Sequence, residues 1–197
     1  MSVEATSSLR KSDRTRRAIL EAARAHFTAR GFDGANLRAI SADASIDPSM
    51  VKRYFGSKEG LFAAAVPVDL QLPTLADVSE ARRGEVLTAH FIRRWEGDLS
   101  DNILVALLRS AITNAKLSEQ VRTLFTSQVM AMLEPVVPAS ELVRRAALIS
   151  SQMLGLAVTR YILALPGSAE QPAEQLIADV APNVQRYLHG VLEEGVR

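Results

Sequence analysis

Helix start and stop signals follow one another closely in the first third of the chain. Gly31 is suited to end a first helix, Asn36 to cap a second, and Asp47 with Pro48 to open a third. Gly56 then ends the third helix and leads into a fourth. Helices this short are not stable alone, so we expect them to pack on the first helix and on one another.

The apolar residues of this region agree with that packing. Ile19, Ala23 and Phe27 recur at helical spacing in the first helix. The aromatic and leucine residues predicted for the core are Phe27, Phe32, Phe55, Leu61 and Phe62. Residues 13–66 are therefore predicted to form a small three-helix domain with a fourth, linking helix. Residues 1–12, rich in Ser, Thr and charge, are predicted to be a flexible basic arm.

The remaining residues, 67–197, keep a helical pattern. Pro67 and Pro73 bracket the connector between the two regions. Further helices are predicted at about 79–96, 101–115, 118–134, 140–165 and 173–193. Since no segment alternates polar and apolar residues as a strand does, we predict an all-α fold of about nine helices, with 67–197 as the larger C-terminal domain.

Charge is divided unevenly between the two regions. Residues 1–62 hold 11 Lys or Arg against 7 Asp or Glu, whereas residues 63–197 hold 12 against 15. A basic N-terminal region and a mildly acidic remainder suggest that the N-terminal region meets a polyanion.

Several classes of function are disfavoured by composition. With no cysteine, the chain has no disulfide, thiolate metal site or thiol nucleophile. His26, next to the apolar residues of the first helix, is predicted to be a packed core or boundary histidine. His90 and His189 are isolated, so neither a metal nor a cofactor is predicted and an enzyme is disfavoured. The chain has neither a secretory signal nor an apolar run of the roughly 20 residues that a membrane span needs, so we expect a cytoplasmic protein.

Two short helices joined by a few residues are typical of the helix-turn-helix, whose second helix reads the DNA major groove. The pattern from Gly31-Phe32 to Leu61-Phe62, with Ile40 and Ile46 between, ends in the run YFGSKEGLF over residues 54–62. This pattern resembles the tetracycline-repressor (TetR) family over residues 13–66. The resemblance implies a DNA-binding transcriptional regulator with a variable, ligand-binding C-terminal domain.

The resemblance also implies which residues meet DNA. Arg38 resembles a position that binds a phosphate or a guanine edge, Tyr54 a phosphate-contacting aromatic, and Lys58 a phosphate clamp at the start of the fourth helix. The recognition helix carries the groove-facing residues. The DNA-binding residues expected are Arg38, Pro48, Ser49, Met50, Lys52, Arg53, Tyr54 and Lys58.

Three positions depart from the family pattern. Asn36 replaces a common Thr and can cap a helix equally well. Ser45 stands where glycine is usual, which strains the turn if the backbone there needs a positive φ; a turn of another type, which accommodates serine, is the alternative. Lys52 replaces a common Tyr and is expected to change the DNA sequence that is read.

For the larger domain the resemblance implies a ligand pocket and a homodimer interface. The pocket residues expected are Phe91, Trp95, Leu104, Leu108, Phe125 and Met130, although the same residues would serve an ordinary core. The dimer residues expected, on helices 140–165 and 173–193, are Ile149, Met153, Leu156, Val180, Val184 and Tyr187. An intramolecular core is the alternative for these as well.

The function that follows is a repressor that binds a palindromic DNA operator as a homodimer and is released by a small, largely apolar effector. The effector is expected to act through the fourth helix, at Leu61, Phe62, Ala65 and Val66, with Pro67 at its end. A ligand-independent regulator or an activator is the alternative. An α-helical enzyme or carrier is a more distant one.

Overall fold

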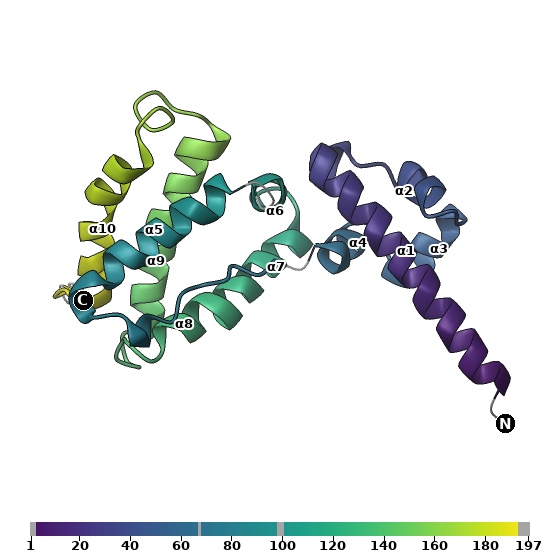
Figure 1. Cartoon of the computed structure of the whole chain (residues 1–197), viewed down its shortest axis with the longest axis horizontal. Coiled ribbons are helices and arrows are strands. Elements are labelled where there is room, and N and C mark those ends of the chain that lie inside the picture. The colour runs from purple at the N-terminus through teal and green to yellow at the C-terminus, as the bar shows by residue number, and fades with distance from the viewer. Residues whose placement is uncertain (1–2, 67, 98–100, 193–197) are drawn as a thin grey trace. The chain divides into compact units, whose positions relative to one another are not determined.

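The computed structural model describes residues 3–66, 68–97 and 101–192, and their side chains over 12–66, 68–97 and 104–192. Every element over these residues is helical (Figure 1), as the sequence predicts. The chain forms two packed units. One holds Met1–Val68 with Asn102–Val121, and the other holds Asp69–Asp101 with Arg122–Arg197.

The first unit begins with four helices. These are α1 (Val3–Gly34), α2 (Leu37–Asp43), α3 (Pro48–Phe55) and α4 (Lys58–Ala65). At its centre, the ring of Phe62 meets those of Phe27 and Phe32 edge to face, with centroids 4.9 and 5.4 Å away. This aromatic cluster fixes α4 to the end of α1.

The predicted breaks between these helices are confirmed. Gly31 interrupts α1 with a φ of 67°. The side chain of Asn36 accepts the amide of Arg38 at 2.8 Å and so caps α2. Asp47 and Ser57 cap α3 and α4 in the same way, by accepting backbone amides two and three residues ahead.

The start of α1 corrects one prediction. Residues 1–12 were expected to be a flexible arm, but α1 begins at Val3. No glycine or proline stands between Val3 and Ala29. Because the packed section of α1 already supplies the helix nucleus, each further residue toward the N-terminus adds to the helix at little cost in free energy.

Ser45 lies in the turn between α2 and α3 with a φ of 54°, in the left-handed region that favours glycine. We predict that Ser45→Gly raises the free energy of unfolding by about 1 kcal/mol, because relief of the strained backbone outweighs the entropy that glycine loses on folding. Ala44, with a φ of −77°, provides the control. Denaturant melts should show Ala44→Gly destabilised, and a loss of stability in Ser45→Gly would contradict the strain.

Residues 102–121 also belong to the first unit. They supply most of α6 (Asp101–Ala111) and α7 (Ala115–Leu124). Asn114 caps α7 through its side-chain oxygen, and its amide nitrogen donates to Glu59 of α4 at 3.3 Å. The packing therefore differs from a simple division at residue 66, because this segment joins the N-terminal helices and not the rest of 67–197.

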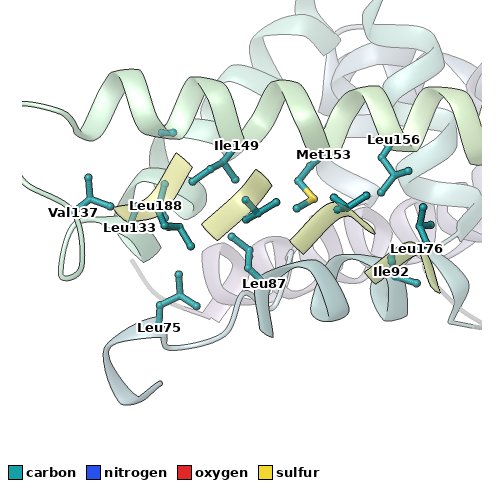
Figure 2. Packing of buried hydrophobic residues seen from close by; sticks show 13 residues of the cluster. Leu75, Leu87, Ile92, Leu133, Val137, Ile149, Met153, Leu156, Leu176 and Leu188 are labelled. Atoms are coloured by element: carbon teal, nitrogen blue, oxygen red, sulfur yellow. The ribbon is translucent and has the colours of Figure 1, made fainter. Parts of the chain in front are cut away.

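The second unit packs α5 (Arg83–Glu96), α9 (Leu142–Ala157) and α10 (Ala173–His189) around one core. Figure 2 shows Ile149 and Met153 of α9 pointing toward the side where α5 carries Leu87. A π-helical segment, η3 (Phe125–Met130), joins α7 to α8 (Ala131–Leu133), and a second, η4 (Val158–Ile162), extends α9. When α7, η3 and α8 are counted as one helix and α9 with η4 as another, the described residues form nine helices besides the short 3₁₀ turns.

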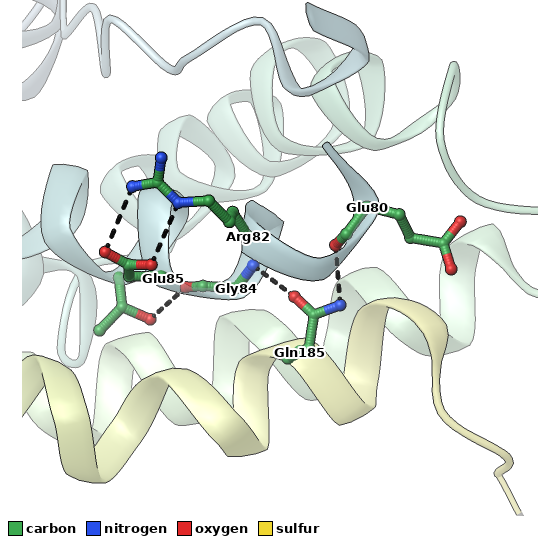
Figure 3. Close-up of polar contacts among 6 residues, drawn as sticks. Glu80, Arg82, Gly84, Glu85 and Gln185 are labelled. Carbon is green, nitrogen blue, oxygen red and sulfur yellow. Dashed lines mark hydrogen bonds and ion pairs between the residues drawn. The ribbon is translucent and has the colours of Figure 1, made fainter. Parts of the chain in front are cut away.

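Close contact between α5 and α10 depends on Gly84. A Cβ atom there would lie 2.6 Å from the backbone nitrogen of Gln185, so a larger residue would push the helices apart. Gln185 accepts the Gly84 amide at 2.7 Å and donates to the carbonyl of Glu80 at 2.9 Å (Figure 3). The glycine and the glutamine together fix where α10 crosses the start of α5.

Candidate nucleic-acid interface

Helix α3 has one face in the core and the other in solvent. Val51 is 1% exposed and anchors the helix on the unit. Of the residues predicted to face the groove, Pro48, Ser49 and Lys52 are exposed and Met50 is half-buried. Arg53, predicted on the same helix to bind DNA, is exposed as well. Two exposed basic residues that follow Val51 and a short hydroxyl at the start of the helix are suited to reading base edges.

Two further predicted DNA-binding residues lie before and after this face in the sequence, Arg38 on α2 and Tyr54 near the end of α3. Arg38, in the first turn of α2, is exposed. The Tyr54 hydroxyl at the end of α3 lies 3.1 Å from the hydroxyl of Ser12 on α1. The sequence does not predict this contact of Ser12, because no nearby residue in the sequence indicates a partner 42 residues away.

Lys58 already has partners within the protein. Its Nζ donates to the carbonyl of Asp33 at 3.2 Å and lies 4.8 Å from the centre of the Phe32 ring. These contacts hold the ammonium group at the first turn of α4, where backbone amides also gather.

Two carboxylates stand among the basic groups. The Ser49 hydroxyl and amide lower the pKa of Asp47, and the Ser57 hydroxyl is the main cause of the lowered pKa of Glu59. Both stay ionised at neutral pH. Each carboxylate lies at a helix N-terminus, which its charge stabilises.

A buried histidine links α1 to α2. His26 is 9% exposed, and its Nε2 lies 2.6 Å from a carboxylate oxygen of Asp43. The sequence predicted a packed histidine here, but nothing in it named the partner. The pair fixes the end of α2, and so the start of the turn that leads to α3.

The predicted pocket residues are divided between the two units. Phe91 and Trp95 of α5, and Phe125 and Met130 of η3, belong to the second unit, whereas Leu104 and Leu108 on α6 belong to the first. Within the second unit Trp95 stacks on Tyr161 at 5.3 Å and lies 5.6 Å from Phe91. Burial raises the pKa of Tyr161 to about 12, so its hydroxyl stays neutral and donates to Glu96.

A hollow of about 350 Å³ lies elsewhere in the second unit. Residues 69–76 form one side of it and residues 128–135 the other. None of the six predicted pocket residues lines it. Its lining residues are Asp69, Leu72, Pro73, Thr74, Leu75, Ala76, Gln128, Ala131, Met132 and Pro135.

The residues predicted for the dimer interface lie mostly in the core of one chain. All but the half-buried Tyr187 are buried within one chain: Ile149, Met153, Leu156, Val180 and Val184. They belong to or pack against the core cluster that α9 and α10 form with α5. Side chains already covered by their own chain have little surface left for a second copy.

Another face of α9 carries the exposed apolar surface. Val143 is 63% exposed and Leu154 40% exposed. Ala147 and Ser151 lie between them, and their spacing puts them on the same side of the helix. We call Val143, Ala147, Ser151 and Leu154 the α9 outer face.

The described residues offer neither a cluster of metal ligands nor a membrane-spanning helix. Among them, no three His, Cys, Asp or Glu side chains gather as metal ligands do. No helix over these residues is long and apolar enough to cross a membrane.

Family models match both regions of the chain. Residues 19–65 match the model for bacterial regulatory proteins of the tetR family, and residues 81–188 match the tetracyclin repressor-like C-terminal domain. No curated protein matches.

Solved structures agree with these matches. A TetR-family regulator from Streptomyces coelicolor A3 is 28% identical, covers 89% of this chain and 95% of its own, and gives a TM-score of 0.62. NalD from Pseudomonas aeruginosa, the secondary repressor of the MexAB-OprM multidrug efflux pump, shares the fold at 19% identity, over 87% of this chain and 97% of its own (TM-score 0.60).

A transcriptional regulator from Rhodococcus sp. Rha1 shares the fold at 23% identity, over 90% of this chain and 99% of its own, again with a TM-score of 0.60. The two family models together cover most of the chain, including the helix-turn-helix and the core of the second unit. The chain therefore belongs to the TetR family of DNA-binding transcriptional regulators.

Proposed function

We propose that this TetR-family chain is a cytoplasmic transcriptional repressor, which binds a palindromic operator as a homodimer and leaves it when a small, largely apolar effector enters the second unit. The observation that carries the proposal is the solvent-facing side of α3. There Ser49, Lys52 and Arg53 are exposed while Val51 holds the helix in place. Arg38, Pro48, Met50, Tyr54 and Lys58 complete the proposed DNA-binding surface.

The homodimer is proposed to form through the α9 outer face. A helix-turn-helix reads one half-site, so an inverted repeat requires two copies whose recognition helices are roughly 34 to 36 Å apart. Val143 and Leu154 place apolar surface in solvent on a helix whose other side is fully packed. Burying this surface against a second copy removes it from water.

The effector is proposed to bind near Phe91, Trp95, Phe125 and Met130. These are the predicted pocket residues that belong to the second unit, and the three aromatic rings and the thioether offer apolar, deformable surface. Leu104 and Leu108 are left out, because both pack in the first unit.

A melting scan of the full-length protein against a library of small apolar compounds tests the ligand response. A compound that binds the native state raises the melting temperature. Adding each hit to a protein–DNA complex then separates the alternatives. Loss of DNA affinity indicates a repressor and a gain indicates an activator, while a library with no hit favours a ligand-independent regulator.

A further inference from the structure

Two side chains on one face of α1 contact the end of α3. The hydroxyl of Ser12 lies 3.1 Å from the hydroxyl of Tyr54. One helical turn further along α1, Cζ of Arg16 lies 5.5 Å from the centre of the Phe55 ring. Tyr54 and Phe55 are the last two residues of α3. The helix is therefore held at two adjacent points by side chains of α1.

These contacts lie where the packed face of α1 leaves the core. Ser12 and Arg16 continue, at helical spacing, the face that carries the fully buried residues Ile19, Ala23 and Phe27. Ser12 itself is only half-buried. A hydrogen bond at such an edge competes with water and adds little to the stability of the fold. Its effect is therefore expected on the hydroxyl that it meets.

A phosphate bound to Tyr54 would decide the direction of this hydrogen bond. In the protein alone, either hydroxyl can be the donor. The oxygens of a DNA phosphate only accept hydrogen bonds, so a tyrosine that binds one must donate its single hydroxyl proton to it. Tyr54 can then only accept from Ser12, which becomes the donor. Hydrogen bonds linked in such a chain polarise and strengthen one another.

We propose that Ser12 is a positioning residue for DNA binding, which directs the hydroxyl proton of Tyr54 toward a phosphate of the operator. The inference deepens the proposed function and rests on it, because Tyr54 is one of the proposed DNA-binding residues. Ser12 acts through Tyr54 and requires no contact of its own with DNA. Phosphates carry no base sequence, so Ser12 sets affinity and leaves the sequence preference unchanged.

The test measures the affinity of the full-length protein for the duplex that the wild type selects from a random library. Ser12→Ala removes the donor and suits a helix, so it should lower the affinity about threefold to tenfold per subunit, as expected for one hydrogen bond. Random duplexes should be weakened alike. The slope of log affinity against log salt should not change, since no charge is lost. Ser12→Thr keeps the hydroxyl and should bind as the wild type does.

Duplexes in which one phosphate is replaced by an uncharged methylphosphonate locate the contact. Tyr54→Phe should reduce the loss of affinity caused by this replacement at one phosphate in each half-site. Ser12→Ala should reduce the loss at that same phosphate and at no other, and should have no further effect in the Tyr54→Phe background. Thr28→Val removes a hydroxyl from another half-buried position of α1 and should match the wild type throughout.

A purely structural role of Ser12 predicts a different pattern. Loss of its hydroxyl would then loosen α3 as a whole, relax the sequence preference and change the loss at several phosphates. That pattern would overturn the proposal, as would a Ser12→Ala variant that leaves the loss at the Tyr54 phosphate unchanged. A Tyr54→Phe variant that binds as the wild type does would also overturn it, with the base-reading role of α3 intact. A wild type that selects no duplex would instead remove the proposed function, and this inference with it.

Discussion

Glutamate in place of Leu156 should unfold the second unit, whereas glutamate in place of Leu154, two residues earlier on α9, should leave a folded monomer. Leu156 is 8% exposed within the core cluster. Truncation of a buried leucine costs about 2 to 5 kcal/mol, and burying a carboxylate without a partner adds more. The sum approaches the roughly 5 to 15 kcal/mol that typically holds a whole domain together.

Leu154 is 40% exposed on the α9 outer face, so a carboxylate there stays hydrated in the monomer. In a dimer formed through this face, the two copies would bury like charges in an apolar contact. Circular dichroism melts show whether each variant is folded, and light scattering at micromolar concentration shows whether it is a monomer or a dimer. Leu163→Glu, at a 58% exposed position beyond η4, is the control and should remain dimeric. A Leu154→Glu variant that stays dimeric would place the interface elsewhere.

Alanine at Lys52 and alanine at Lys58 should weaken DNA binding in different ways. Lys52 is exposed on α3, and its proposed role is to read a base. Lys52→Ala should cost roughly 1 to 3 kcal/mol per half-site on the selected duplex and relax the preference at one position. Lys58 is held at the first turn of α4 by Asp33, and its proposed partner is a phosphate. Lys58→Ala should weaken all duplexes alike.

Salt titrations distinguish the two roles. Removing one phosphate contact lowers the slope of log affinity against log salt by about 0.9, so Lys58→Ala should flatten it by nearly one unit per subunit. Arg93→Ala removes the same charge from an exposed position of α5 and should leave binding unchanged. An equal loss of affinity for selected and random duplexes in Lys52→Ala would show that Lys52 contacts the backbone and reads no base.

The helix-turn-helix could be predicted in detail because its signals are local. A capping side chain and the amide that it accepts are two or three residues apart, as at Asn36, Asp47 and Ser57. Such features depend on neighbours in the sequence, so they can be predicted without knowledge of the tertiary packing. The turn at Ser45 was only partly predictable, because the sequence left open a strained turn or a turn of another type, and the φ of 54° comes from the structure.

Features that depend on distant partners could not be predicted. The apolar stripes that contain Leu156 on α9 and Val184 on α10 indicate that these surfaces are covered, but not whether the same chain or a second copy covers them. The structure gives that role to α5 of the same chain. Likewise, the helical pattern of residues 102–121 does not reveal that they pack with the first unit, since the contact between Asn114 and Glu59 joins residues 55 positions apart.

Selection of DNA from a random duplex library by the full-length protein shows whether α3 reads a DNA sequence. We expect one enriched inverted repeat, whose half-sites are about one helical turn apart, in keeping with two recognition helices on one face of the duplex. The combined Ser49→Ala, Met50→Ala and Lys52→Ala variant should bind DNA at low salt yet enrich no sequence. Enrichment of the same repeat by that variant, or no enrichment by the wild type, would contradict the assignment of α3 as the reading helix.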